Sequence, residues 1–363
     1  MQVLVNGKEL GAALKYHAKV CKSAPAMHST LHSSVLISAA DGQLTVTSTD
    51  LTMFLTTHHD CNIDGATVPV LVDVAALRKA LAAIKGSAFL EFPETAGAGF
   101  VLIVRGGGYE FRLSSSDPVC FPNIPAPAPE VAAYCFTASE YLSIVGKVAP
   151  SMDRNIYQRL EFQGVCFRQR EHLEVMATDS RRFARVTLVG NPATPGEWII
   201  PAAAIDCFTP SDGVLVEFDA DQCRLASGNT EIVTLLVGAE FPDVDCIIPA
   251  TTAHTVSIDR EQLRAALVNL GAKPGPGDLV VTTTFDADGA LHLATADNSA
   301  ATVVHYDGDA GDVHAAFFGG YFLDGVAACD SAVVMRFDDD KHPVLLSGDS
   351  FMYLVMPHKM LEE

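Results

Sequence analysis

The chain has 363 residues, of which 49% are hydrophobic and 19% are charged, and its formal net charge is -20 at pH 7. This length favours two or three domains, each large enough to bury a core without disulfides or metals. The apolar content excludes intrinsic disorder, no apolar run is long enough to span a membrane, and the N-terminus lacks the layout of a signal peptide. Nine scattered cysteines form no CxxC pair, so we expect them to be reduced and mostly buried. We therefore expect a soluble cytoplasmic protein.

The first predicted element is an amphipathic helix over residues 7–22. Its apolar stripe, at helical spacing, consists of Leu10, Leu14, His17 and Cys21. The opposite face carries four lysines, which are Lys8, Lys15, Lys19 and Lys22. A second helix follows, with an apolar stripe of Val74, Leu77, Leu81 and Ile84 and with the basic residues Arg78, Lys79 and Lys85. Both helices combine one apolar face with one basic face.

Later stretches repeat the helical pattern. Residues 138–148 carry Leu142, Val145 and Val148 at helical spacing, and residues 259–270 carry Leu263, Leu267 and Leu270. Two further helices are expected over residues 201–208 and 317–329. Short alternating or β-branched runs predict strands over residues 34–38, 44–49, 89–92, 100–105, 109–114, 214–218, 279–285, 333–337 and 353–356. The triple glycine at 106–108 fits a hairpin turn better than a phosphate-binding loop.

One sequence pattern occurs three times. The copies are DGQLTVTSTD (41–50), REHLEVMATD (170–179) and DGALHLATAD (288–297), and their final aspartates lie 129 and then 118 residues apart. Such repetition indicates duplicated structural units. A Pro/Ala-rich stretch at residues 125–133 favours an extended linker. We therefore predict three similar α+β domains over residues 1–125, 126–249 and 250–363, with Asp50, Asp179 and Asp297 in structural turns.

Charge is distributed unevenly over these domains, whose net charges are -1, -8 and -11 in chain order. An acidic surface repels nucleic acid, yet basic residues gather on the predicted helices of domain one. Arg260 and Arg264 lie one turn apart on a helix of domain three. A solvated helix face explains such charge on a single helix, but its recurrence in an acidic chain favours contact with nucleic acid.

No part of the sequence predicts a catalytic centre. His58, His59, Asp60 and Cys61 have metal-ligand side chains, but neighbours in a strand point to opposite faces and converge poorly on one ion. The sequence contains no GxSxG, HExxH or Walker pattern. We expect no metal, no cofactor and no enzymatic activity. A metal-dependent hydrolase built around His58 is the weakest of three hypotheses.

Four segments resemble the bacterial DNA polymerase III β subunit family, the β sliding clamps. They are ADGQLTVTSTDLTMFL (40–55), LEVMATDSRRFARV (173–186), EFPDVDCIIP (240–249) and YLVMPHKML (353–361). The resemblance covers essentially the whole chain in the family's order and spacing. It implies three tandem domains of the DNA clamp fold, with helices lining a hole, sheets on the rim and two subunits joined head to tail around duplex DNA. A weakly basic lining and an acidic exterior suit a protein that slides without reading bases.

The resemblance also implies three sets of site residues. Those expected to face DNA are Lys15, Lys19, Lys22, Arg78, Lys79, Lys85, Arg154, Arg260 and Arg264. A pocket for peptide motifs of partner proteins is expected from Phe162, Thr178, Ser180, Arg181, Arg182, Phe183, Pro242, Ile247, Val344, Leu354, Val355, Met356 and Pro357. The dimer joint is expected from Phe111 and Leu113 of domain one and from Leu267 and Leu270 of domain three. The sequence departs from the family pattern at Ser180, Phe183, Val244 and the acidic end 361–363.

The leading hypothesis is a non-catalytic sliding clamp, the processivity factor that tethers a replicative polymerase to DNA. Its expected partners are double-stranded DNA, a DNA polymerase catalytic subunit, the clamp loader, other proteins with clamp-binding motifs and a second copy of the chain, in the cytoplasm at the nucleoid. The alternative is a clamp-like decoy that binds peptide motifs without encircling DNA.

Overall fold

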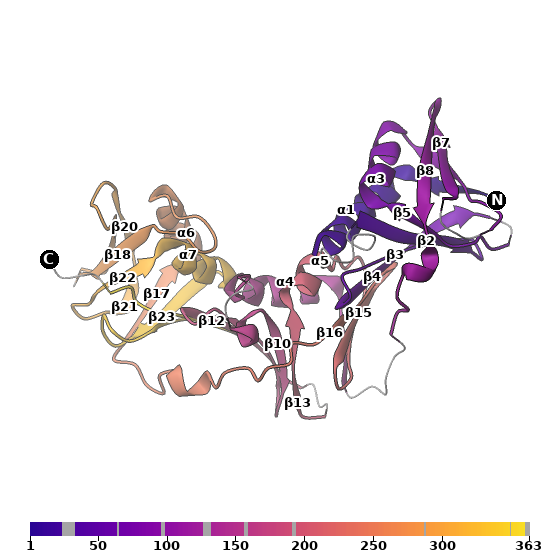
Figure 1. Ribbon diagram of the computed structural model, residues 1–363. Helices are drawn as coiled ribbons and strands as arrows, with labels where there is room; N and C mark the ends of the chain where they lie inside the picture. The colour runs from indigo at the N-terminus through magenta and orange to yellow at the C-terminus, as the bar shows by residue number, and fades with distance from the viewer. Residues whose placement is uncertain are drawn as a thin grey trace. The chain divides into compact units, whose positions relative to one another are not determined.

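The computed structural model describes residues 1–23, 33–63, 65–95, 99–125, 132–155, 159–190, 194–286, 288–348 and 350–359 (Figure 1). The chain divides into two compact units: Met1–Ser139 with Ala203–Leu236, and Glu140–Ala202 with Val237–Glu363. Most of the predicted linker at 125–133, and the acidic end 361–363, lie outside the described residues.

The first unit is built on one antiparallel sheet with the strand order β1-β6-β7-β8-β5-β2-β3-β4-β16-β15-β14-β9 and an additional β1–β4 pairing. Its strands are β1 (Gln2–Asn6), β2 (Ser34–Ala40), β3 (Gln43–Thr49), β4 (Met53–Asn62), β5 (Val70–Asp73), β6 (Ser87–Glu91), β7 (Val101–Gly106), β8 (Tyr109–Ser116), β9 (Ala132–Phe136), β14 (Val214–Phe218), β15 (Gln222–Ser227) and β16 (Thr230–Leu235). Its helices are α1 (Gly7–Ser23), α3 (Val74–Ala83), the short α5 (Ala202–Cys207) and the 3-10 turn η1 (Pro118–Cys120). α1 and α3 pack against each other and against the sheet (Figure 1).

The second unit contains two antiparallel sheets, with the orders β13-β10-β11-β12-β25-β24-β23-β17-β21 and β20-β19-β18-β22. Its strands are β10 (Gly164–Gln169), β11 (Leu173–Thr178), β12 (Arg182–Leu188), β13 (Gly196–Pro201), β17 (His254–Asp259), β18 (Val280–Phe285), β19 (Ala290–Thr295), β20 (Ala301–His305), β21 (Asp307–Asp309), β22 (His314–Phe318), β23 (Ala332–Phe337), β24 (Val344–Ser347) and β25 (Phe351–Val355). Its helices are α4 (Ala138–Val148), α6 (Arg260–Asn269), α7 (Gly319–Ala328) and the 3-10 turns η2 (Ala149–Ser151), η3 (Leu160–Phe162) and η4 (Asp245–Ile247).

Helix α1 confirms the predicted amphipathic pattern. The four residues of its apolar stripe are fully buried in the core between helices and sheet. Complete burial of each leucine stabilises the fold by about 1.5–3 kcal/mol. Helix α3 begins where Asp73 accepts a hydrogen bond from the backbone N–H of Ala76 at 2.7 Å, an N-cap that satisfies one donor of the first turn.

The repeated aspartates occupy equivalent turns, which confirms their predicted structural role. In each copy one carboxylate oxygen accepts hydrogen bonds from backbone N–H groups two or three residues ahead. The pairs are Asp50 with Thr52 and Met53, Asp179 with Arg181 and Arg182, and Asp297 with Ser299. The residue after each aspartate has a positive φ: 78° at Leu51, 73° at Ser180 and 55° at Asn298. The repeat therefore places an aspartate before a left-handed residue in all three turns, and the first two copies also share the backbone hydrogen bond from the aspartate N–H to the carbonyl three residues ahead.

One predicted helix face is wrong. Leu142 is 54% exposed, whereas the buried face of α4 consists of Tyr141, Ile144, Val145 and Val148. The large Tyr141 ring fills the core and sets the helix phase, which turns Leu142 outward.

The predicted hairpin turn and the burial of most cysteines are confirmed. Gly107 and Gly108 form the two-residue loop of the β7–β8 hairpin, both with positive φ. All nine cysteines are free, and five of them are buried. Over the described ranges, no helix is both long enough and apolar enough to cross a membrane.

Candidate functional site

The second unit contains an open pocket of about 770 Å³. Four segments line it: the chain after α4, the turn between β11 and β12, the loop between α6 and β18, and the start of α7. The lining residues are Pro150, Met152–Asn155, Phe162, Asp179–Arg182, Pro274–Asp278, Phe318, Tyr321 and Asp324. The pocket therefore combines aromatic surface with charges of both signs.

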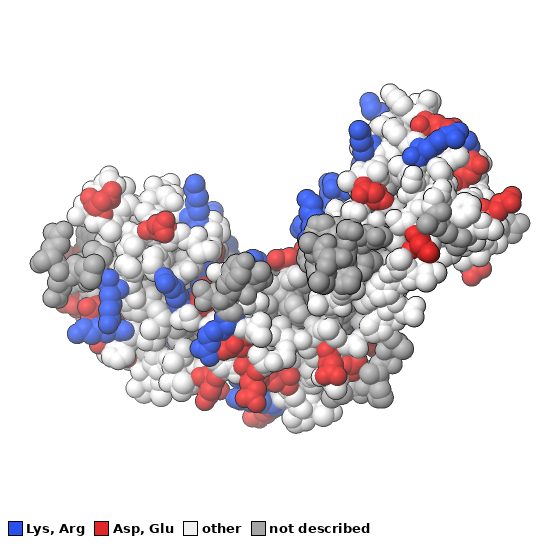
Figure 2. Space-filling view, viewed as in Figure 1, with Lys and Arg blue, Asp and Glu red and all other residues white. Residues whose placement is uncertain are grey.

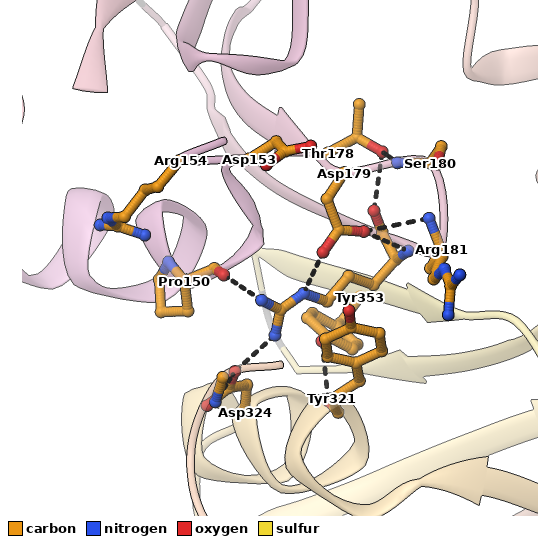
Figure 3. Close-up of polar contacts among 12 residues, drawn as sticks. Pro150, Asp153, Arg154, Thr178, Asp179, Ser180, Arg181, Tyr321, Asp324 and Tyr353 are labelled. Atoms are coloured by element: carbon orange, nitrogen blue, oxygen red, sulfur yellow. Dashed lines mark hydrogen bonds and ion pairs between the residues drawn. The ribbon is translucent and has the colours of Figure 1, made fainter. Parts of the chain in front are cut away.

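Arg182 joins three of these segments through its hydrogen bonds to Asp179, Asp324 and Pro150, which Figure 3 labels. Its side chain is 2% exposed, and all three guanidinium nitrogens donate hydrogen bonds. Nε donates to Asp179 at 2.9 Å, and the two terminal nitrogens donate to Asp324 and to the carbonyl of Pro150. The guanidinium also lies 4.2 Å from the ring centroid of Tyr321. Because its donors are engaged within the protein, Arg182 positions the pocket wall and is poorly placed to bind a ligand.

The turn beside Arg182 presents side chains to the pocket. Two hydrogen bonds of the Thr178 hydroxyl span this turn, in which Ser180 has a positive φ. The hydroxyl accepts from the N–H of Ser180 at 3.2 Å and donates to the carbonyl of Arg182 at 2.7 Å. The guanidinium of Arg181 lies 5.3 Å from the ring centroid of Phe318. The exposed Arg181 is thus held over an aromatic ring at the rim.

The predicted pocket residues fall into three groups. Four line the cavity, and these are Phe162, Ser180, Arg181 and Arg182. Five are buried behind the surface, and these are Thr178, Phe183, Val344, Leu354 and Val355. The remaining four lie on neighbouring segments: Met356 and Pro357 directly after β25, where the N–H of Met356 donates to the Arg181 carbonyl at 2.9 Å, and Pro242 and Ile247 on the stretch that includes η4.

The sequence did not predict Asp324, Phe318, Tyr321 or the Pro274–Asp278 loop as pocket residues. One signal could have indicated Asp324: it is the only charged residue in the apolar helix α7, GGYFLDGVAA. Phe318 and Tyr321 flank two glycines, and this pattern in the sequence does not indicate a pocket.

The basic residues predicted on α1 and α3 form one face of the first unit. Lys8, Lys15, Lys19, Lys22, Lys79 and Lys85 are exposed and Arg78 is half-buried. Figure 2 shows Lys and Arg side chains gathered along the edge where Figure 1 places α1 and α3. None of these seven cations forms a salt bridge within the part of the chain that is described. The face therefore presents uncompensated positive charge, apart from nearby Glu9.

The basic residues predicted in the second unit are placed differently. Arg260 and Arg264 both pair with Glu261 of their own helix, at 2.6 and 3.1 Å, and Arg260 also donates to the Cys329 carbonyl. Arg154 donates to the Ala149 carbonyl at 3.3 Å and lines the pocket. Glu261 therefore partly neutralises the charge of Arg260 and Arg264. The charge of Arg154 lies at the pocket.

The four predicted joint residues also differ in exposure. Phe111 and Leu113 on β8 are half-buried against the core of the first unit. β8 pairs with β7 along its length but with β5 only at Ser115 and Ser116, so over Tyr109–Ser114 its other edge has no strand partner among the described residues. Leu267 and Leu270 are buried inside the second unit, whereas Val268 of α6 is a large apolar residue that is exposed.

A buried hydrogen-bond chain lies under α1. Nδ1 of His17 lies 2.8 Å from the Ser48 hydroxyl and Nε2 lies 2.9 Å from the Thr57 hydroxyl, which lies 3.0 Å from Nε2 of His59. Burial, with His59 nearby, lowers the pKa of His17 to about 3, and burial also lowers the pKa of His59. Both rings are therefore neutral. No cluster of three or more metal-ligating side chains occurs in the described ranges.

Several known proteins similar to this chain are named as sliding clamps or as DNA polymerase III subunit beta. No protein-family model matches the chain. A β sliding clamp from Chlamydia muridarum is 22% identical over 388 residues, which cover 100% of both chains. A sliding clamp (DNA polymerase III subunit beta) from Bartonella birtlesii, bound to griselimycin, is 20% identical with a TM-score of 0.85, covering 99% of this chain and 100% of that one. The DNA polymerase III subunit beta from Borrelia burgdorferi, in complex with a natural product, has a TM-score of 0.87 at 15% identity over the same shares.

This chain resembles the bacterial β sliding clamps along its whole length and has their fold. The α+β architecture predicted from the sequence is confirmed by these matches.

Proposed function

We propose that the chain is a non-catalytic DNA sliding clamp, composed of three tandem domains over residues 1–125, 126–249 and 250–363. Two copies close head to tail around duplex DNA and tether a polymerase to it. The observation that carries this proposal is the way in which the strands pair at the two domain junctions.

Each junction pairs corresponding strands. β4, the edge strand of the group β5-β2-β3-β4 in domain one, pairs with β16, the edge strand of the group β9-β14-β15-β16 in domain two. β12 and β25 pair in the same way between domains two and three. By the same rule the outer edge of β20 in domain three has no strand partner among the described residues, and the corresponding open edge in domain one is that of β8. An open strand edge of this kind is completed by another chain, and pairing β20 with β8 of a second copy closes a ring.

The repeat also predicts the register of that contact. Val46, Val175 and Leu293 hold the same place in the three copies of the repeated pattern. Their partners on the next strand are Thr57, Val186 and Thr302, which we therefore treat as equivalent positions. The partners of Thr57 and Val186 across the junctions are Thr230 and Phe351, each the first residue of its strand. Tyr109 holds that position in β8. Tyr109 should therefore lie opposite Thr302 of the partner subunit.

The basic face of α1 and α3 suits the phosphate backbone of DNA. Exposed lysines attract phosphates without reading bases, and their hold weakens as salt rises. The acidic remainder of the chain discourages DNA from binding elsewhere. Retention on DNA then comes from enclosure, so that weak contacts remain compatible with sliding.

The pocket of the second unit suits short peptide motifs. Its aromatic floor offers an apolar anchor, and charged residues at the rim supply specificity. The proposed occupants are segments of the polymerase catalytic subunit, the clamp loader and other clamp-binding proteins. The protein is proposed to act in the cytoplasm at the nucleoid.

Loading onto circular DNA tests this function. The purified chain is incubated with a clamp loader, ATP and nicked plasmid, and bound protein is separated from free protein by gel filtration. A sliding clamp co-elutes with the circle and is released when a restriction enzyme linearises it. Failure to load, while peptides still bind, favours the decoy that does not encircle DNA. A strictly monomeric mass at micromolar concentration contradicts the ring directly.

A further inference from the structure

The loop Pro274–Asp278, between α6 and β18, forms one wall of the pocket in the second unit. We propose that this loop determines which peptides the pocket accepts, and that Asp278 selects a basic side chain in the bound segment. This inference rests on the proposed function, because it requires that the pocket receive partner peptides.

The loop is held in a fixed position relative to the pocket floor. The N–H of Gly275, which has a φ of 89°, donates to the Asp324 carboxylate at 2.9 Å, and the same carboxylate receives a hydrogen bond from Arg182. On the other side of the loop, a Cβ atom at Gly320 would overlap the carbonyl oxygens of Gly275 and Lys273. Two glycines thus allow loop and helix to touch. A wall positioned before binding costs less entropy when a peptide arrives.

Most charged residues of the pocket are already engaged. Arg182 is neutralised by Asp179 and Asp324. The guanidinium of Arg181 lies over the Phe318 ring. The carboxylate of Asp153 accepts a hydrogen bond from the N–H of Asn155 at 2.8 Å, and Arg154 donates to a backbone carbonyl.

Asp278 differs from these residues. It is exposed at the end of the loop, it lines the pocket, and it forms no salt bridge with any residue in the described ranges. An incoming cation therefore reaches this exposed carboxylate without breaking an existing ion pair or hydrogen bond, whereas Asp153 is half-buried and accepts a backbone hydrogen bond.

The net charge of the surrounding residues also favours a basic peptide. Residues 250–363, which supply this wall, carry a net charge of -11. A surface of this charge attracts basic segments and slows the approach of acidic ones. Phe318 and Tyr321 meanwhile offer apolar surface on the pocket side. The occupant that fits is a short peptide with an apolar anchor and a Lys or Arg beside it, paired with Asp278.

Selection from a displayed library of random nine-residue peptides tests this inference on the full-length chain. The wild type should enrich Lys or Arg at one position near the apolar anchor, and Asp278→Lys should enrich Asp or Glu at that position. Peptides selected on the wild type should bind Asp278→Lys about fivefold more weakly in calorimetry, as expected for an ion pair at a solvated rim. Glu171→Lys is the matched control: it reverses an exposed acid in the β10–β11 turn with the same change in net charge, and it should retain the wild-type consensus.

The other outcomes separate the two ideas. An unchanged consensus in Asp278→Lys overturns the selective role of the loop and leaves the peptide pocket standing. If no peptide is enriched, or if the enriched peptides bind Phe318→Ala undiminished, then the pocket is not the peptide site and the inference fails with it. Loading onto circular DNA is measured independently and is unaffected by either result.

Discussion

The guanidinium of Arg182 on β12 donates a hydrogen bond to the carboxylate of Asp324 on α7, and both side chains are buried. This pair joins the second copy of the repeated turn to helix α7 within the second unit. Removing one partner of a buried ion pair leaves the other charge without compensation.

Arg182→Ala should therefore be strongly destabilising. Asp179 and Asp324 would both lose their cation, and we expect the free energy of unfolding to fall by about 3–5 kcal/mol in urea denaturation. The matched control is Arg181→Ala, one residue away but exposed, which should cost less than about 0.5 kcal/mol. Equal stability of the two variants would contradict a structural role for Arg182.

The His17 network predicts a specific acid sensitivity. In the unfolded chain His17 takes up a proton near pH 6.5, whereas in the folded chain burial holds its pKa at about 3. The unfolded state thus binds more protons between these values, so stability falls as pH drops from about 6.5 towards 3, by up to about 1.4 kcal/mol per pH unit from this group.

Thermal melts from pH 7 to pH 4 measure this slope. His17→Gln should lower stability at pH 7, because hydrogen bonds to Ser48 and Thr57 are disturbed, but it should flatten the acid dependence. His342→Gln, an exposed histidine, serves as control and should leave the slope as in wild type. A slope unchanged by His17→Gln would assign the acid sensitivity to other groups.

These contacts show what could be predicted from sequence. Periodicity predicted the buried stripe of α1 correctly, because a helix with one apolar face has only one good way to pack. It failed at Leu142 of α4, because two neighbouring faces of this helix are apolar. The face that carries the large Tyr141 side chain is the one that packs into the core. Residues 142 positions apart, as in the Arg182–Asp324 pair, have no local pattern that joins them. The Pro-Gly-Pro-Gly sequence at 274–277 likewise carries no pattern that indicates its contact with Asp324.

The repeated turn predicts a stabilising substitution. Leu51 has a φ of 78°, a left-handed backbone conformation that strains any residue with a β-carbon. Its side chain is 37% exposed, so burial of the leucine offsets little of this strain. Asparagine tolerates this conformation better, and it stands at the equivalent position 298. Leu51→Asn should raise stability by about 0.5–1 kcal/mol, seen as a higher midpoint of thermal unfolding. A lower midpoint would show that the packing of the leucine side chain outweighs the strain.

The two sets of basic residues should differ in their effect on DNA. A triple change of Lys15, Lys19 and Lys22 to Ala removes uncompensated cations, and release from nicked circles should become faster at moderate salt. The slope of log affinity against log salt should shrink by about 0.9 for each phosphate that the variant no longer neutralises. Arg264→Ala removes a cation already paired with Glu261 and should change release little. Equal effects would contradict a DNA-binding face centred on α1.

The register of the proposed ring joint can be tested by cross-linking. If β8 of one subunit continues the sheet at β20 of the other, Tyr109→Cys combined with Thr302→Cys places two thiols directly opposite each other. Cα atoms of directly opposed strand residues lie about 4.5–5.5 Å apart, within the range that a disulfide bridges. Mild oxidation should then give a covalent dimer on a non-reducing gel. A reducing agent should cleave the disulfide and return the chain to the monomer band.

Tyr109→Cys combined with Val303→Cys is the matched control. Successive residues of a strand point to opposite faces, so the thiol at position 303 should face away from the thiol at 109 and remain unlinked. Nine native cysteines are present, and each single variant therefore sets the background. Because a one-residue slip reverses every side chain, equal cross-linking of both pairs would contradict the register that the two internal junctions predict. A dimer without any cross-link would place its joint on a surface other than these two strand edges.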